Sequence, residues 1–223
     1  MVFGGGVRSS LHWSTLPMHH MEEQMNLKQK ETRISNLRKE LDKALEIQEE
    51  KLAGRIKAIG FKCSKCAQCC KAQYGDNTVI VFPSEIKKIC EKTGLSRDDF
   101  VIPTPSLDRD SGGNIHTFEW ILKKNCDCIF LKNELCEIYD SRPYICSTYP
   151  FYIVNGTLEI SECIGIGGNI STQECLMLAA LLKERYINEI RESIALLERF
   201  NGFNPGGSGN VCVHDSEGEH WIH

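Results

Sequence analysis

A dense run of cysteines between Phe61 and Tyr74 constrains this chain more than any other feature. The run reads FKCSKCAQCCKAQY, and four of its cysteines fall within eight residues: Cys63, Cys66, Cys69 and Cys70. Two cysteines separated by two residues can turn the backbone so that both sulfurs meet one ion, and thiolates are strong ligands for soft metals. Three sulfurs at this spacing can cover one side of a metal centre, whereas Cys70 would point elsewhere and reach a second centre. The run therefore predicts metal binding.

Composition places these cysteines in a reducing compartment. Twelve of the 223 residues are cysteine, which is about 5% and falls short of the roughly 8–10% of a small secreted disulfide scaffold. No N-terminal window combines a basic start, an apolar run and a small-residue cleavage site. The longest purely apolar run, residues 176–182, is too short to cross a bilayer. We therefore expect a cytoplasmic protein with no membrane association, in which cysteines serve as ligands or thiols rather than disulfides.

Charge and motif searches exclude several function classes. The formal net charge of -4 gives no global reason to expect binding to nucleic acid or to an acidic membrane surface. The turn CIGIGGN does not fit the dinucleotide-binding pattern G-x-G-x-x-G. Counted from Gly165, the sixth position of the pattern should be glycine, and it is Ile170. A C-x-x-x-C-x-x-C motif for radical chemistry on S-adenosylmethionine is absent, because the step from Cys66 to Cys70 leads to Gln73. We find no Ser/His/Asp set or catalytic carboxylate pair, so the expected partner is a protein or redox partner.

The N-terminal part divides into a tail and a helix. Residues 1–25 are rich in Gly, Ser and His without periodicity, which predicts a disordered tail. Over residues 26–59, apolar positions such as Leu27, Ile34 and Leu41 recur every seven residues among charged ones, which predicts one long amphipathic helix. Two interpretations stay open: a coiled coil that forms a homodimer, or a helix packed on the cysteine-containing domain.

Residues 60–203 alternate between short strand and helix patterns, which predicts an α+β fold with a small, irregular, metal-stapled core. This core would be flanked by the long N-terminal helix and by a C-terminal helix. Pro83 opens a helix that runs to Gly94. The pair Asn155-Gly156 is typical of a type I′ hairpin turn. A capping box that begins at Ser171 opens a helix to about Phe200.

Other ligand-type residues do not join the predicted site. Residues 204–223 form a Gly-rich stretch that predicts a flexible tail, and it carries four such residues: Cys212, His214, His220 and His223. His116 lies beside a predicted strand and is interpreted as a surface or packing residue. Cys90 and Cys175 fit best as buried small apolar residues, and Cys126 has no assigned role.

Four more cysteines lie in structured surroundings downstream of the dense run. They are Cys128 in CDCIFL, Cys136 in LCEIY, Cys146 in RPYICSTYPF and Cys163 in CIGIGG. With the four cysteines of the dense run they make eight, the number needed for two four-thiolate centres. The predicted metal ligands are therefore Cys63, Cys66, Cys69, Cys70, Cys128, Cys136, Cys146 and Cys163.

In these motifs the sequence resembles the YkgJ-type cysteine-cluster family, described as a zinc- or iron-chelating domain. The family's C-x-x-C-G-x-C-C corresponds to CSKCAQCC, its C-x-F-L to CIFL, its C-x-I-Y-x-x-R-P-x-x-C to CEIYDSRPYIC, its Y-P-F to residues 149–151 and its C-x-G-I-G to CIGIG. The likeness covers roughly residues 61–168. Ala67 stands where the family usually has glycine, and Ser147 stands where an arginine often follows the cysteine.

The resemblance implies metal binding without one settled activity. Some members are labelled iron–sulfur oxidoreductases, and the flagellin lysine methylases carry the domain beside a methyl-transfer role. All-thiolate ligation suits both zinc and iron–sulfur clusters. A structural zinc ribbon usually has two C-x-x-C knuckles, whereas this chain has one dense run and scattered single cysteines. We expect an iron–sulfur protein with a redox or cluster-handling role; the alternatives are a zinc-stapled protein-interaction module and a part in protein lysine methylation.

Overall fold

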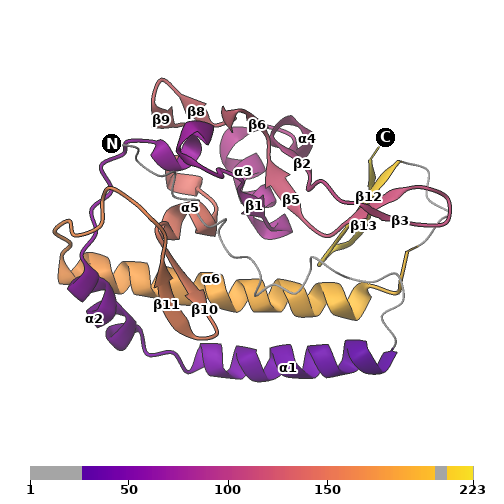
Figure 1. Cartoon of the computed structure of the whole chain (residues 1–223), viewed down its shortest axis with the longest axis horizontal. Coiled ribbons are helices and arrows are strands. Elements are labelled where there is room, and N and C mark those ends of the chain that lie inside the picture. Colours follow the sequence, from indigo (N-terminus) through magenta and orange to yellow (C-terminus); the bar gives the residue numbers. More distant parts are fainter. Residues whose placement is uncertain (1–26, 204–209, 223) are drawn as a thin grey trace, which may run out of the picture.

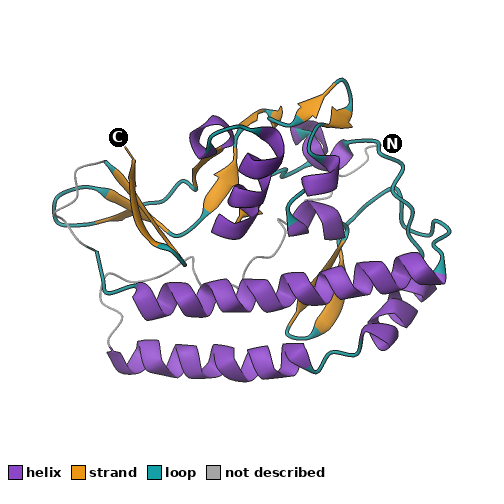
Figure 2. Cartoon of the chain, turned by 180° about the vertical axis from the view of Figure 1, so that it is seen from behind, coloured by secondary structure: helices purple, strands orange, loops and turns teal. Residues whose placement is uncertain are grey.

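Three helices form one layer of the molecule, and the shorter elements lie on top of it (Figure 1). The computed structural model describes residues 27–203 and 210–222, so the predicted tail over residues 1–25 lies outside the described part. Helices α1 (Leu27–Leu45) and α6 (Thr172–Arg199) run side by side (Figure 2). They are antiparallel, because the early part of α1 contacts the end of α6: the Lys30 ammonium donates to the carbonyl of Phe200 at 2.6 Å.

The prediction of one helix over residues 26–59 is wrong in one respect, because this segment forms two helices. Helix α1 ends at Leu45, and α2 (Glu49–Ile59) starts after a turn at residues 46–48. After the break, both helices place their apolar faces against α6. Together with α6 and the hairpin described below they enclose a first hydrophobic core, to which α1 and α2 contribute Leu37, Ala44, Leu52, Ala53 and Ile56. The apolar stripe therefore packs within the chain.

A second hydrophobic core lies under a small antiparallel sheet of order β1-β5-β2. Its strands are β1 (Ile80–Val81), β5 (Trp120–Leu122) and β2 (Val101–Pro103). Helix α3 (Pro83–Thr93) begins at the predicted proline and ends before Gly94, whose φ of 74° needs a left-handed backbone. Helix α4 (Arg97–Phe100) follows and buries Phe100 completely.

Very short elements connect this sheet to the rest of the chain. Three are 3-10 turns: η2 (Gln68–Cys70), η3 (Ala72–Tyr74) and η4 (Tyr139–Ser141). Two are hairpins: β6 (Lys124–Asn125) with β7 (Asp127–Cys128), and β8 (Leu131–Lys132) with β9 (Leu135–Cys136). Helix α5 (Tyr144–Thr148) completes this region. Strands of two residues form few hydrogen bonds, so other interactions must hold them.

The hairpin predicted around Asn155-Gly156 is confirmed. Strands β10 (Phe151–Val154) and β11 (Thr157–Ile160) pair in antiparallel register, and the turn residues have φ of 50° and 75°. Positive φ at both central residues is what a type I′ turn requires. The capping box of α6 is also confirmed, because the Ser171 hydroxyl accepts from the Glu174 backbone N–H at 3.2 Å.

The prediction of a flexible tail over residues 204–223 is wrong for residues 210–222. These residues form β12 (Val211–Asp215) and β13 (Gly218–Ile222), which join β4 (Ile115–Thr117) and β3 (Asp108–Arg109) in a sheet of order β13-β12-β4-β3. Strand β12 pairs in parallel with β4, almost a hundred residues earlier in the chain. Local composition cannot reveal such a long-range partner.

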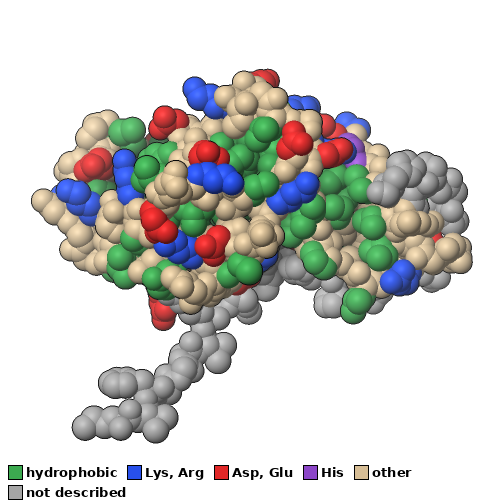
Figure 3. Space-filling model, turned by 90° about the horizontal axis from the view of Figure 1, so that it is seen from above, with side chains coloured by type: hydrophobic (Ala, Val, Ile, Leu, Met, Phe, Trp, Pro, Cys, Tyr) green, Lys and Arg blue, Asp and Glu red, His purple; other side chains and the backbone are tan. Residues whose placement is uncertain are grey.

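The structure confirms the α+β class, with short strands and a long C-terminal helix. Within the described residues, none of the helices combines the length and the apolar character that a bilayer crossing would need. On the face seen in Figure 3, acidic and basic side chains are interspersed among hydrophobic ones, in keeping with the small net charge.

Candidate metal centre

The eight predicted cysteines come from six separate places in the fold. Cys63 and Cys66 lie in the extended segment after α2, and Cys69 and Cys70 lie in η2. Downstream, Cys128 ends β7, Cys136 ends β9, Cys146 lies in α5 and Cys163 follows β11. Three parts lie together in Figure 1, on the side of the molecule away from α1: the β8–β9 hairpin, helix α5, and the short turns η2 and η3 that follow α2.

The dense run obtains its shape from two residues in a left-handed backbone conformation. Lys65 has φ of 55°, and Ala67, which precedes η2, has φ of 56°. These turns alternate with the cysteines and give the run a sharply curved path. A left-handed conformation costs a non-glycine residue roughly 1–2 kcal/mol. The departure from the glycine of the resembling family is therefore tolerated at Ala67, at some cost in stability.

Five thiols gather in a first group, made of Cys69, Cys70, Cys128, Cys136 and Cys146. The sulfurs of Cys69 and Cys70 are 3.9 Å apart. Burial raises the pKa of Cys146 well above its ordinary value, and the negative charges of Cys128, Cys69 and Cys136 raise it further. A thiol whose pKa is raised by other thiols lies where several negative charges would meet. Such a place favours a cation.

Within this group Cys69 is the exception. Its hydrogen bond with Cys70 lowers its pKa to about 7, although burial opposes the shift. The same bond, together with burial and the charge of Cys69, raises the pKa of Cys70. Cys69 is therefore the thiol of the pair that becomes a thiolate, and hence a metal ligand, at the lower pH.

Three further thiols, Cys63, Cys66 and Cys163, form a second group. Burial raises the pKa of Cys163 first of all, and the charges of Cys66, Cys63 and Cys69 add to that effect, so Cys69 belongs to the surroundings of both groups. The backbone N–H of Gly165 donates to the Cys163 sulfur at 3.4 Å. Hydrogen bonds of this kind stabilise negative charge on sulfur and tune a metal that the sulfur binds.

Two glycines allow the two segments of this second group to approach closely. An added Cβ at Gly165 would lie 2.5 Å from the carbonyl oxygen of Lys62, and one at Gly168 would lie 2.7 Å from the Lys62 backbone nitrogen. Any side chain at these positions would push the CIGIGG turn away from the start of the dense run. The glycine-rich turn thus serves close packing of backbone against backbone.

A guanidinium supplies positive charge beside the first group. The Arg142 side chain stacks on the ring of Tyr139 at 3.6 Å and its Nε donates to the Tyr139 carbonyl at 2.8 Å. Its charge lowers the pKa of Cys136, although burial is the larger effect there and raises it. Ser147 replaces the arginine that often follows the cysteine in the resembling family, and Arg142 provides a cation near the same thiols.

Polar contacts connect the segments that carry the first group. The Asn77 side-chain amide donates to the carbonyls of Cys70 at 3.0 Å and of Cys126 at 2.9 Å. The backbone N–H of Ala72 donates to the Asp127 carboxylate at 2.9 Å, and Lys71 forms an ion pair with Glu134. The apolar side of the group is closed by the second core, against which Cys128, Cys136 and Cys146 pack.

The cysteines of the two groups are suitable ligands for a metal that binds thiolates. Their sulfur atoms lie farther apart than the ligands of one bound ion would. Among residues 27–203 and 210–222, three ligand atoms within 4.8 Å of one another occur at a single place, which is formed by His116, Cys212 and His214. A metal would therefore have to draw the sulfurs of each cysteine group closer together by rotation of their side chains.

Sequence reasoning missed the site formed by His116, Cys212 and His214. All three are buried, so His116 is a packing residue as expected, whereas Cys212 and His214 lie in a strand and not in a flexible tail. The two valines at the start of Val211–Asp215 have a high strand preference and are a signal that could have found β12. Of the other unassigned cysteines, Cys175 is buried in the first core, Cys90 packs against the second and Cys126 is exposed.

Comparison with known proteins identifies a metal-chelating family for this part of the chain. A family model for CxxCxxCC, described as "Putative zinc- or iron-chelating domain", matches residues 62–192. This range is more than half of the chain and contains all eight predicted cysteines. No curated protein and no solved structure matched the chain.

Proposed function

Because the chain belongs to the CxxCxxCC family of zinc- or iron-chelating domains, we propose that its metal is an iron–sulfur cluster with a redox or cluster-handling role. The proposed ligands are the eight cysteines in two groups: Cys69, Cys70, Cys128, Cys136 and Cys146, and Cys63, Cys66 and Cys163. Metal binding itself follows from family membership and from the number of cysteines.

The observation that carries the proposal is the environment of Cys146. This thiol lies in a helix of five residues, and the charges that raise its pKa come from thiols on β7, β9 and η2. Nothing in the local sequence requires four segments to bring cysteines to one place. A bound metal would neutralise the charges that otherwise repel one another there.

One feature favours an iron–sulfur cluster over zinc, namely the exposure of ligands in both groups. Cys63 and Cys69 are exposed, so each group has a member at the surface. An iron–sulfur cluster supplies reversible one-electron chemistry, and exposed ligands would give a redox partner or an acceptor of the cluster direct access. Arg142 and the N–H of Gly165 would stabilise negative charge on the sulfurs.

A zinc-stapled interaction module is the second candidate, and the very short strands favour it. The region contains four strands of two residues each, β6, β7, β8 and β9. Hydrogen bonds alone do not stabilise strands this short, so the region needs a further stabilising interaction. Structural zinc contributes directly to folding in small domains. In this case the metal would hold a surface for a protein partner, with no redox change.

One experiment separates the two candidates. Full-length protein purified without oxygen would be analysed for iron, zinc and acid-labile sulfide, and its visible spectrum would be recorded before and after dithionite. Iron with sulfide and broad absorption that bleaches on reduction would support the cluster. Zinc in whole-number amounts in a colourless protein would overturn it and support the module.

A pair of variants tests the assigned ligands. Cys146→Ser is expected to lose most of the metal of the first group, because a serine hydroxyl is a poor ligand for soft metals. Cys175→Ser is the control, since Cys175 also lies in a helix but is buried in the helical core, whereas Cys146 is half-buried against the second core. The control should keep its full metal content. Equal metal in both variants would contradict the assignment of Cys146.

A further inference from the structure

A second ligand cluster lies in the C-terminal sheet, built from residues that the cysteine site does not use. In the parallel pairing of β12 with β4, Cys212 is the partner of His116. His214 lies two residues after Cys212 on β12, so both side chains point to the same face of the sheet. Cys212 and His214 also lie beyond residues 62–192, the range of the family match. Neither the family nor the proposed function accounts for this cluster.

Potential ligand atoms converge closely in this cluster. Nδ1 of His116 is 2.7 Å from Nε2 of His214, and one ligand atom of each of His116, Cys212 and His214 lies within 4.8 Å of the other two. The exposed fractions of the residues are 0% for His116, 0% for Cys212 and 2% for His214. Polar groups buried this deeply need partners of their own.

One carboxylate orients His116. Its Nε2 lies 3.1 Å from Oδ2 of Asp110, a buried residue. Asp110 is held in turn by the backbone N–H groups of Gly112 and Asn114, at 2.8 and 3.0 Å, and by the Asn114 amide at 2.8 Å. An acidic oxygen accepts a hydrogen bond from Nε2–H, which leaves the lone pair of His116 on Nδ1. Metal-bound histidines commonly have such a carboxylate behind them.

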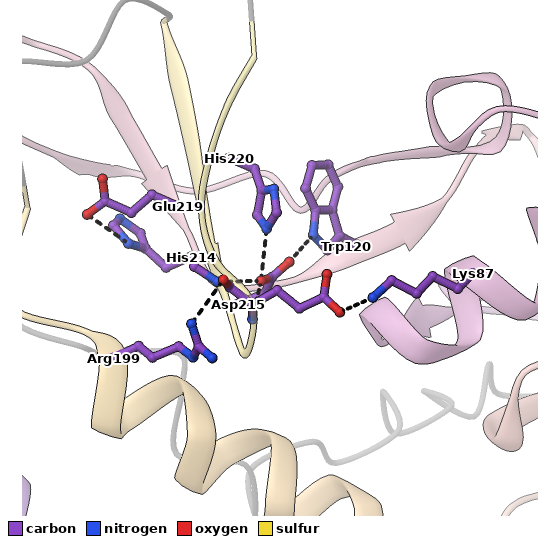
Figure 4. A network of polar contacts seen from close by, with 9 residues as sticks. Lys87, Trp120, Arg199, His214, Asp215, Glu219 and His220 are labelled. Atoms are coloured by element: carbon purple, nitrogen blue, oxygen red, sulfur yellow. Dashed lines mark hydrogen bonds and ion pairs between the residues drawn. The ribbon is translucent and has the colours of Figure 1, made fainter.

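A second carboxylate lies behind His214. Nδ1 of His214 is 3.9 Å from Oε1 of Glu219, on the neighbouring strand β13 (Figure 4). This distance is too long for a hydrogen bond, but the negative charge of Glu219 favours a proton on Nδ1 and hence the lone pair of His214 on Nε2. Each carboxylate thus favours the tautomer whose lone pair faces the other ring. Two lone pairs at 2.7 Å repel, so either a proton shared by the rings or a metal ion beside them must offset the repulsion, and the Cys212 thiol is next to both.

The walls of the cluster are aromatic. The Phe203 ring stacks on His116 with centroids 4.1 Å apart, and the Phe118 ring stacks on His214 at 5.3 Å. Trp221 meets His116 edge-on at 5.8 Å. Two imidazoles and a thiol in apolar surroundings suit zinc, whereas magnesium and calcium prefer oxygen ligands.

We propose that Nδ1 of His116, Nε2 of His214 and Sγ of Cys212 bind a zinc ion that fastens the C-terminal hairpin β12–β13 to β4. Two nitrogens at about 2.0–2.1 Å from one tetrahedral ion lie about 3.3 Å apart. Binding therefore separates the two rings by about half an ångström from their present distance. Deprotonation of Cys212 on binding releases one proton, which goes to solvent.

Cadmium NMR on the full-length protein tests this site directly. Zinc would be exchanged for ¹¹³Cd, whose resonance moves downfield with each thiolate ligand, so a site of one thiolate and two imidazoles is distinct from an all-thiolate site. We expect one resonance of the mixed type per chain, in addition to any all-thiolate signals. Wild-type protein with all-thiolate signals alone would overturn the proposal, and would mean that a proton, not a metal, lies between the rings.

Two variants complete the test. Cys212→Ala should lose the mixed resonance and lower the metal count by one per chain, whereas the all-thiolate signals persist. Cys175→Ala is the matched control, because it removes another buried thiol and should keep every resonance. If Cys212→Ala does not fold, the wild-type spectrum still decides. Failure of the iron–sulfur proposal would alter the all-thiolate signals, whereas failure of this one would remove the mixed signal.

Discussion

The side-chain amide of Asn77 donates a hydrogen bond to the backbone carbonyl of Cys70 at 3.0 Å. The same amide donates to the carbonyl of Cys126 at 2.9 Å, so it connects the dense cysteine run to the β6–β7 hairpin. Asn77 is 7% exposed. Two segments that carry proposed ligands are therefore positioned by one buried side chain that is not itself a ligand.

Asn77→Asp is expected to lower the free energy of unfolding by about 2–3 kcal/mol, because a buried carboxylate cannot donate to either carbonyl and repels both. Lys124, whose ammonium lies 3.3 Å from Oδ1 of Asn77, offsets part of this loss. Urea unfolding and the metal content of the purified protein measure the effect. Asn125→Asp makes the same change at an exposed position of β6 and should alter both quantities little.

Gly165→Ala should displace the CIGIGG turn, since the new Cβ would lie 2.5 Å from the Lys62 carbonyl and 2.9 Å from the Phe61 ring. Backbone atoms cannot give way as a flexible side chain can. We expect loss of metal from the second cysteine group together with a lower melting temperature. The metal count and a thermal melt check this.

Gly54→Ala is the control for that substitution, because a Cβ at Gly54 meets nothing within 4 Å and the residue lies inside α2. Alanine is favoured over glycine in a helix by about 1 kcal/mol, so this variant should be as stable as the wild type or more stable. Similar destabilisation by the two substitutions would show that contact with Lys62 is not the cause.

Removal of the metal with a chelator should destabilise the β6–β7 and β8–β9 hairpins and leave the helices α1, α2 and α6 folded. Strands β6–β9 have two residues each, whereas α1, α2 and α6 share an extensive apolar core. Hydrogen exchange followed by mass spectrometry should show lost protection over residues 63–75 and 124–146. Protection in α6 should remain near its original level, and equal loss everywhere would argue against a local role of the metal.

Glu85→Gln is expected to destabilise the protein by about 1–2 kcal/mol at neutral pH. The two carboxylate oxygens of Glu85 accept from the backbone N–H of Phe82 at 2.9 Å and of Tyr144 at 2.6 Å, which joins the start of α3 to the start of α5. Glutamine has one acceptor oxygen, so its NH2 group must face one of these donors. Denaturant unfolding gives the difference.

The effect of this substitution should depend on pH. Burial raises the pKa of Glu85 above its ordinary value, although its two backbone hydrogen bonds oppose the shift. The native state therefore binds this proton more tightly than the unfolded state, and wild-type stability falls as pH rises through that window. The stability advantage of wild type over Glu85→Gln should be larger at about pH 5 than at about pH 7. An advantage that grows with pH would contradict the raised pKa.

Several elements could be read directly from local residue patterns. Pro83 begins a helix, Asn155-Gly156 forms a hairpin turn, and the box from Ser171 to Glu174 caps α6, because each of these signals acts over a few residues. The spacing of the dense cysteine run likewise indicates metal binding, and the family match agrees. Signals of this kind depend on backbone geometry and side-chain chemistry that neighbours along the chain already contain.

Tertiary contacts decided the rest. The heptad repeat of Leu27, Ile34 and Leu41 is interrupted at Gln48, and the chain breaks at residues 46–48, so that both halves pack on α6, which lies more than a hundred residues away. The hairpin of residues 210–222 exists as part of a sheet with β4, and that pairing brings Cys212 beside His116. Amino-acid order alone tells which side chains can bind a metal. Which of them meet depends on long-range pairing and burial, whose free energy belongs to the whole fold.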